Sequence, residues 1–298
     1  MPDNRISILP IELASLVGQL LLDVPEGGWS CESVDLTGRL SISVEALVDM
    51  LTNTRVDARH FRIYSDGRPE SIDPWISMPG YRRERTAFLG GERIAELIGS
   101  NRTVVIDHLE LLIHDLERAR DLVETECRGW VHVNAYVAGG VAQGLPGHRD
   151  DHDVVVIQCD GSRRWILEAN GSGQTETRLG PGEALLIGRG TAHAAYHDAD
   201  CGPSLHLTFA IIRPRVVHTV SEALRRLALK SSTFSTDVTS ETDVSLEGLI
   251  DAAIQELDQE MRRLLVDSAD NLLHLRREQW MEGFRPDEGP LVPPFDRA

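Results

Sequence analysis

The residues with the clearest capacity for chemistry are two histidines and one aspartate. His148 and Asp150 flank a single arginine and stand just before an apolar run, 154–157, that is typical of a buried strand. Residues two apart on an extended chain point to the same side, so both side chains can reach one ion. His193 follows a second apolar run across a short glycine turn. Two imidazoles and one carboxylate can occupy one face of an octahedral metal and leave its other positions open.

A His-x-Asp triplet is weak evidence when it stands alone, because the chain has 11 histidines. The segment that ends at His193 strengthens the case for a metal site. Its Pro-Gly turn, apolar strand and following histidine resemble the second motif of cupin-type metal sites. Three other histidines could compete as ligands. His152 belongs to the same short segment as the first pair, His197 is expected in a polar loop, and His206 is expected to be a buried polar residue on a strand.

Short apolar runs separated by glycine-rich turns fill the middle of the chain. They predict strands over 131–137, 154–158, 164–167, 184–187 and 205–212. Closely spaced strands of this kind favour a barrel or a double-sheet jelly roll. We therefore expect a mainly β protein with helical additions, in three parts. These are a mixed α/β region over 1–100, a double-stranded β-helix core over 101–215, and a helical region with a flexible tail over 216–298.

Helical periodicity surrounds this core. It predicts helices over 11–22, 43–51, 92–98 and 108–124, with strands over 61–64 and 103–106. Ser43 is the expected N-cap of the second helix, and Ser245 offers favourable chemistry at the start of a C-terminal helix. In the helix over 108–124, the residues expected to face a core are Leu109, Leu112, Leu116 and Leu122. Apolar residues between 246 and 265 form a stripe that could pack on its own core or on a second subunit, so a homodimer through these helices stays open.

The net charge of -17 argues against a nucleic-acid or anionic-membrane partner, because both favour a basic surface. An acidic surface keeps a protein well solvated, and it can also attract a basic peptide. The four cysteines are scattered without a C-x-x-C pair, which predicts neither a zinc site nor a disulfide framework. We expect no membrane span and no signal peptide, and reduced cysteines favour a cytoplasmic location.

Residues 134–168 resemble the JmjC-type ribosomal oxygenases, Fe(II)- and 2-oxoglutarate-dependent enzymes that hydroxylate ribosomal-protein side chains. Eleven positions follow the family pattern: Asn134, Tyr136, Gln143, Gly144, His148, Asp150, Asp153, Gln158, Gly161, Arg163 and Trp165. The stretch from Pro181-Gly182 to His193 and the run 204–208 agree with the distal half of the pattern.

The resemblance implies that His148, Asp150 and His193 hold Fe(II), to which O2 would bind. It also implies that Arg163 pairs with the far carboxylate of the 2-oxoglutarate co-substrate, and a guanidinium can grip a carboxylate through two parallel hydrogen bonds. Asn134 and Tyr136 would line the co-substrate pocket, whereas Trp165 is expected in the core. The implied enzyme is a dioxygenase that hydroxylates a side chain of a protein or peptide, with a basic segment favoured by the acidic balance.

Three departures from the family pattern leave the substrate open. The family's Thr-Pro-Pro is Ala138-Gly139-Gly140 here, the segment between Asp150 and His193 is short, and so is the C-terminal region. The same chemistry could act on a free amino acid or a natural-product intermediate, and it could give demethylation or desaturation. A cupin-like binding module without catalysis is the alternative from another class.

Overall fold

The computed structural model describes residues 6–25, 27–77, 87–139, 144–168, 173–197, 202–213, 215–237 and 246–266. These residues form two compact units, one of 6–127 with 131–212 and the other of 128–130 with 213–266. The predicted three-part division of the chain stays a prediction.

Two β-sheets build the larger unit. The larger sheet has the order β2-β12-β9-β14-β7-β6-β4-β5, and the smaller one has the order β11-β10-β13-β8. A short pair, β1 (Ser7–Ile8) with β3 (Leu40–Ser41), stands apart from them. The other strands are β2 (Trp29–Ser33), β4 (Phe61–Ser65), β5 (Arg68–Glu70), β6 (Thr103–Ile106), β7 (Trp130–Ala138), β8 (His148–Arg149), β9 (Asp153–Asp160), β10 (Arg163–Glu168), β11 (Thr175–Leu179), β12 (Glu183–Ile187), β13 (Ala192–Tyr196) and β14 (Ser204–Ile212).

The double-stranded β-helix predicted from the sequence is confirmed. Its two halves are β12-β9-β14-β7 in the larger sheet and β11-β10-β13-β8 in the smaller one. The five strands predicted in this core agree with β7, β9, β10, β12 and β14 to within two residues at each end. Strands β8, β11 and β13 were not predicted, because two residues make no pattern and β11 is largely polar and exposed.

Strand β9 in the middle of the larger sheet is buried on both faces. Val155 and Ile157 of β9 belong to the main hydrophobic core, whereas Val154 and Val156 pack with Trp165 of the opposite sheet in a second cluster. Alternate residues of a strand point to opposite faces. A strand covered on both sides therefore has an almost continuous apolar sequence, which is the pattern that made β9 predictable.

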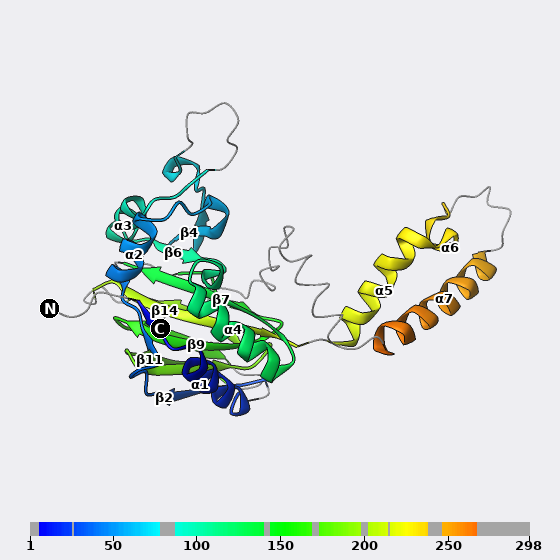
Figure 1. The fold of residues 1–298 in the computed structure, drawn as a ribbon, viewed down its shortest axis with the longest axis horizontal. Coiled ribbons are helices and arrows are strands. Elements are labelled where there is room, and N and C mark those ends of the chain that lie inside the picture. The colour runs from blue at the N-terminus through cyan, green and yellow to red at the C-terminus, as the bar shows by residue number, and fades with distance from the viewer. Residues whose placement is uncertain are drawn as a thin grey trace. The chain divides into compact units, whose positions relative to one another are not determined.

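Helices α1 (Pro10–Leu22) and α4 (His114–Cys127) lie side by side over the larger sheet (Figure 1). Helices α2 (Val44–Thr52) and α3 (Gly91–Gly99) form a second pair, and Ser43 Oγ accepts a hydrogen bond from Ala46 N at 3.1 Å. The predicted N-cap is thus confirmed. Single 3-10 turns lie at Ala58–His60, Asp73–Trp75 and Leu109–Leu111.

The helix predicted over 108–124 is wrong at its start. His108 has a left-handed backbone with φ of 57°, and a 3-10 turn follows it before α4 begins at His114. A left-handed residue cannot continue a right-handed helix, so the register of the apolar residues changes at this point. Leu109 and Leu116 are buried as expected, but Leu122 is 43% exposed.

The smaller unit contains α5 (Val216–Lys230), α6 (Ser232–Ser235) and α7 (Leu246–Val266), which agrees with the helical prediction for this region. Helices α5 and α7 pack on each other, and Ala223, Leu227 and Leu264 are buried. Ser245, which was expected to stabilise the start of the C-terminal helix, lies outside the described residues. None of the described helices is both long and apolar enough to cross a membrane.

Candidate metal centre

The pairing of β8 with β13 brings the predicted site residues together. His148 and His193 are direct cross-strand partners, and their ring centroids are 4.4 Å apart. Asp150 follows β8, with Oδ1 at 3.6 Å from His148 Nε2 and Oδ2 at 3.5 Å from His193 Nε2. One potential ligand atom from each residue lies within 4.8 Å of the other two. Among the described residues, no other group of three His, Cys, Asp or Glu side chains meets this condition.

The backbone fixes which nitrogen of each imidazole faces the aspartate. His148 Nδ1 lies 2.9 Å from Pro146 O, and His193 Nδ1 lies 3.1 Å from Thr191 O. A carbonyl oxygen only accepts hydrogen bonds, so each Nδ1 carries the proton and donates it. Each Nε2 then keeps its lone pair and points toward Asp150, which is the tautomer that a metal ligand requires.

The charge states also suit ligands. Burial lowers the pKa of His193 to about 4, so its imidazole is neutral near pH 7. Burial alone would raise the pKa of Asp150, but the imidazoles of His152, His193 and His148 outweigh it and lower that pKa. The centre therefore offers an ionised carboxylate and a neutral imidazole, both of which donate electron pairs to a cation.

Arg149 lies between the two members of the first pair and faces the opposite side of the strand, as expected. Its Nη1 donates to Gly190 O at 2.6 Å, in the turn that leads to His193. In the same turn, Gly190 N donates to Asp150 O at 2.8 Å. These two bonds hold the segments that carry the three candidate ligands against each other.

Polar and aromatic side chains inside the barrel adjoin the three residues. The Arg163 side chain is 2% exposed, and a Cβ at Gly144 would lie 2.5 Å from its Nη2, so a larger residue at position 144 would displace the guanidinium. Tyr136 stacks on His206 with centroids 4.9 Å apart, and Trp165 meets His206 edge-on at 5.4 Å. Trp165 also lies 6.2 Å from the ring of His193. The rings thus form a continuous wall that reaches the candidate metal ligands.

Several buried side-chain atoms of this interior have no hydrogen-bond partner among the described residues, including Thr103 Oγ1, His206 Nδ1 and Trp165 Nε1. Burying a polar atom without a partner costs about 1–3 kcal/mol, so a bound water or a polar ligand that supplied the missing hydrogen bonds would be favoured here. Thr103 Oγ1 and Arg163 Nη2 both lie close to Gly144. A guanidinium, a hydroxyl and ring nitrogens fit a small dicarboxylate.

Asn134 lies on the same face of β7 as Tyr136, but its side chain makes a hydrogen bond that supports the fold. Its Oδ1 accepts a hydrogen bond from His108 N at 3.0 Å and so supports the left-handed turn before α4. Its expected contribution to the co-substrate pocket stays a prediction.

The three histidines that could have competed as ligands lie outside the group of three. His152 is half-buried with its ring 6.1 Å from that of His132, and His206 is buried on β14 as expected. His197 follows the end of β13, outside any strand, as expected for a loop residue. It is nevertheless only 3% exposed, and its Nδ1 lies 3.3 Å from Ser204 Oγ at the start of β14.

Sequence reasoning missed Thr103 as a pocket residue and treated Trp165 and His206 as part of the core or its surroundings. Strand alternation offered a signal, because these side chains share strands with apolar neighbours that face the other way. Strand alternation assigns these side chains to one particular site only when the neighbouring strands are known.

Comparison with known proteins confirms the resemblance seen in the sequence. Residues 109–178 match the JmjC domain family. Ribosomal oxygenase 2 of Rattus norvegicus is 31% identical over 112 residues, which cover 32% of this chain and 24% of the relative. The bifunctional lysine-specific demethylase and histidyl-hydroxylase NO66 of Drosophila willistoni is 29% identical over 189 residues, or 57% of this chain and 23% of the relative.

The chain spans about a quarter of the length of these curated relatives. Among solved structures, the Escherichia coli ribosomal oxygenase YcfD with cobalt and 2-oxoglutarate has 17% identity and a TM-score of 0.49. That match covers 81% of this chain and 65% of YcfD.

Proposed function

Starting from the likeness to JmjC-type ribosomal oxygenases, we propose that this chain is an Fe(II)- and 2-oxoglutarate-dependent dioxygenase. Its reaction is the hydroxylation of a side chain in a protein or peptide. The observation that carries the proposal is the convergence of His148, Asp150 and His193 beside the polar pocket of Arg163.

The donor set suits ferrous iron. Two imidazole nitrogens and one carboxylate on one side of a metal form the facial triad of non-haem Fe(II) oxygenases. Bound iron would supply the activation of dioxygen, coupled to oxidative decarboxylation of 2-oxoglutarate. The chain holds the two Nε2 atoms toward the ion through the carbonyls of Pro146 and Thr191. Arg149 keeps the turn before His193 close to Asp150.

The pocket wall binds and orients the co-substrate. The Arg163 guanidinium would grip the far carboxylate, and burial strengthens such a charge-assisted contact. Thr103 Oγ1 offers a further hydrogen bond near Gly144. The stacked rings of Tyr136 and His206 would form a flat wall beside the bound co-substrate.

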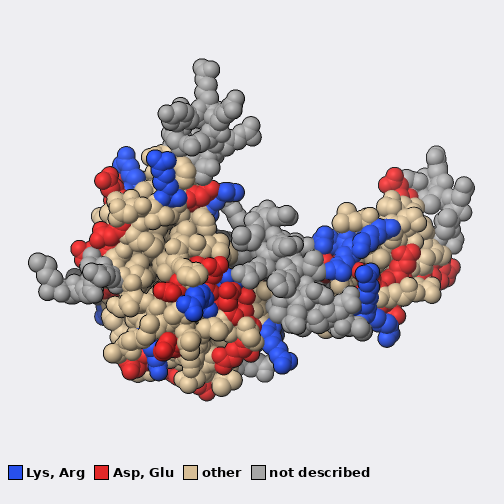
Figure 2. All heavy atoms as spheres, viewed as in Figure 1, with Lys and Arg blue, Asp and Glu red and all other residues tan. Residues whose placement is uncertain are grey.

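A protein or peptide target is preferred over a small molecule because the relatives are described as a ribosomal oxygenase and as a demethylase and histidyl-hydroxylase. The net charge of -17 favours a basic segment, and Figure 2 shows Asp and Glu side chains in several separate patches, with Lys and Arg among them. A free amino acid or natural-product intermediate remains the alternative substrate, and demethylation or desaturation the alternative outcome. The reduced thiols of Cys31 and Cys159 agree with the cytoplasmic location that we propose.

The direct test is incubation of the iron-loaded protein with 2-oxoglutarate and peptides from a cell extract. We expect succinate to form, and mass spectrometry to detect peptides that gain one oxygen. His148→Ala should abolish both signals, whereas His114→Ala, at a 79% exposed side chain, should leave them unchanged. If no peptide or metabolite pool supports succinate formation above the His148→Ala level, the chain is a binding module instead.

We further propose that the helices of the smaller unit form a homodimer. Leu229, Ile250 and Ile254 are 76%, 50% and 61% exposed. Apolar side chains left exposed on a helix pair are typical of a surface that another subunit covers. Light scattering should give twice the monomer mass, and Ile254→Glu should reduce it to the monomer. Gln255→Glu adds the same charge at a neighbouring exposed position and should leave the dimer intact.

A further inference from the structure

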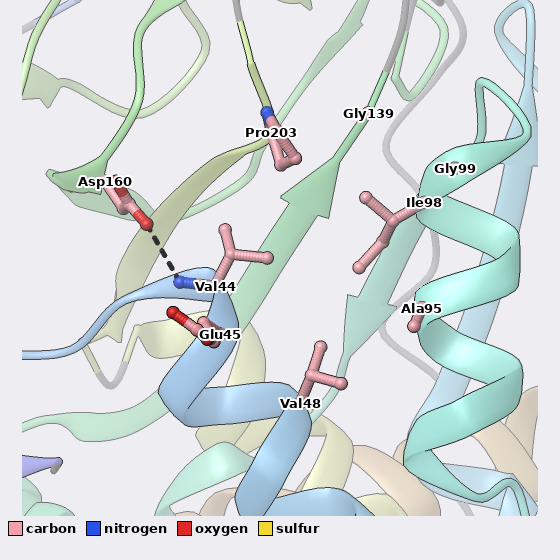
Figure 3. A pocket seen from close by; sticks show the side chains of 9 residues that line it. All are labelled: Val44, Glu45, Val48, Ala95, Ile98, Gly99, Gly139, Asp160 and Pro203. Carbon is pink, nitrogen blue, oxygen red and sulfur yellow. Dashed lines mark hydrogen bonds between the residues drawn. The ribbon is translucent and has the colours of Figure 1, made fainter. Parts of the chain in front are cut away.

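A second concave site lies on the larger unit, at the other end of β9 from the candidate metal ligands. It is an open groove with a volume of about 680 Å³ (Figure 3). Its lining residues come from α2, α3 and the ends of β7, β9 and the segment before β14: Val44, Glu45, Val48, Ala95, Ile98, Gly99, Gly139, Asp160 and Pro203. Strand β9 begins at Asp153, just after the ligand segment, and ends at Asp160. At about 3.3 Å per residue the groove is about 23 Å away along the strand.

The groove exists because α2 and α3 approach each other closely at one end only. A Cβ at Gly91 would collide with Thr52 and with the backbone of Val48, so the helices touch there. Toward Val44 and Gly99 they leave the open space seen in Figure 3.

Two further contacts fix the walls. A Cβ at Gly139 would collide with Ile98 O, so the end of β7 packs directly on α3. Asp160 Oδ2 accepts a hydrogen bond from Val44 N at 3.0 Å and ties α2 to β9. The shape is therefore set by contacts in which at least one partner is the backbone.

The lining combines apolar side chains with negative charge alone. Val44 and Val48 are half-buried, and Ala95 and Pro203 are exposed, so apolar surface is accessible to a partner. The only charged residues in the lining are Glu45 and Asp160, which lie on the same side of the groove (Figure 3). An apolar groove with a carboxylate edge favours a ligand that is apolar and cationic.

We propose that this groove is a docking site for a short segment of a protein partner that places an apolar side chain beside an arginine or lysine. The apolar side chain packs between Val44, Val48 and Ala95. The cation meets Glu45 and Asp160, whose oxygens can accept further hydrogen bonds. The site is complete without the candidate metal centre, so it stands independently of the proposed oxygenase activity.

The experiment uses the full chain without added metal and two fluorescein-labelled peptides. The basic probe is acetyl-Leu-Arg-Leu-Arg-Leu-amide, and the acidic probe replaces each arginine with glutamate. We expect fluorescence anisotropy to give at least tenfold tighter binding of the basic probe, and its affinity to fall as salt is raised. Methyl NMR should show shifts at Val44, Val48 and Ile98.

Matched variants separate the groove from general electrostatic attraction. Glu45→Gln should weaken the basic probe about two- to fivefold, as expected for an exposed ion pair. Glu12→Gln removes a carboxylate from the first turn of α1, as Glu45→Gln does in α2, but lies outside the lining and should change nothing. Ala95→Trp fills the groove from an exposed position and should abolish binding.

Equal binding of both peptides, or equal effects of Glu45→Gln and Glu12→Gln, would overturn the proposal. Undiminished binding to a folded Ala95→Trp variant would do so as well. If that variant fails to fold, the docking proposal is still tested by the comparison of Glu45→Gln with Glu12→Gln and by the methyl shifts.

Discussion

Strands β7, β9 and β14 of the larger sheet are buried on both faces, yet the two faces differ in chemistry. Along these strands, the face covered by helices is apolar: Val131, Val133, Ala135, Val137, Val155, Ile157, Leu205, Leu207, Phe209 and Ile211. The face toward the barrel interior combines apolar Val154 and Val156 with buried polar side chains: His132, Asn134, Gln158, His206 and Thr208.

This difference separates stability from chemistry within single strands. Burial of apolar side chains is the main favourable term in folding. Buried polar groups cost free energy unless they are paired, so their concentration on one face indicates binding. The helix-covered face therefore holds the fold together. The interior face packs toward the smaller sheet, which carries the candidate ligands His148 on β8 and His193 on β13.

The largest effect is expected from a deletion on the apolar face. Leu207 is fully buried there, and Leu207→Ala should lower the free energy of unfolding by about 2–5 kcal/mol, because a cavity remains. Urea denaturation measures this loss. Leu22→Ala, at an 84% exposed position, should stay within about 0.5 kcal/mol of the parent chain. The affinity of the folded Leu207→Ala variant for cobalt(II) should not change. A lower affinity would contradict the separation of stability from chemistry between the two faces.

The next effect concerns the barrel interior and a metal ion. Cobalt(II) at about 100 times its dissociation constant should raise the free energy of unfolding by about 2.7 kcal/mol. His193→Ala should remove this gain, and the melts without cobalt measure separately what the loss of the buried imidazole costs the metal-free protein. Thermal melts with and without cobalt provide the measurement. Metal stabilisation that survives His193→Ala would mean that the ligands lie elsewhere.

A smaller effect is expected at the pocket wall. Arg163→Met should weaken 2-oxoglutarate binding about tenfold to a hundredfold, since a charge-assisted hydrogen bond contributes about 1.5–3 kcal/mol. Arg164→Met is the control. Arg164 is the next residue on β10, its guanidinium lies over the ring of Tyr196, and it pairs with Glu176 at 2.9 Å. Calorimetric titration of the cobalt-loaded protein compares the two variants, and equal affinities would exclude Arg163 from the pocket.

The smallest effect lies outside both faces. Ser43→Ala removes the N-cap of α2 and should destabilise the protein by about 1 kcal/mol. Ser43→Asp restores an acceptor for the same N–H group and should recover most of this loss. Neither variant should alter cobalt or 2-oxoglutarate binding. A change in either affinity would show that α2 and the interior face are coupled.

The sequence was most informative where a pattern is local. The apolar runs predicted β9, β12 and β14, because strands buried on both faces need such runs. The Ser43 cap was predictable because the hydrogen bond spans three residues. The predicted start of the helix over 108–124 was wrong because His108 has a left-handed backbone. Hydrophobic periodicity carries no information about such a conformation at a histidine.

For the candidate metal centre, the residue types and the His-x-Asp spacing, together with the family resemblance, were enough to choose His148, Asp150 and His193. The spacing itself is a local property of an extended chain. Arg163 was selected in the same way, from its place in the pattern.

Only the tertiary structure decided how these residues meet. The pairing of β8 with β13 is non-local, because it joins residues about 45 positions apart whose register depends on the whole barrel. The carbonyls of Pro146 and Thr191 that orient the imidazoles, and the unpartnered Thr103 Oγ1, became visible only in three dimensions. The groove between α2 and α3 depends likewise on contacts at Gly91 and Gly139, and no sequence pattern encodes such close approaches.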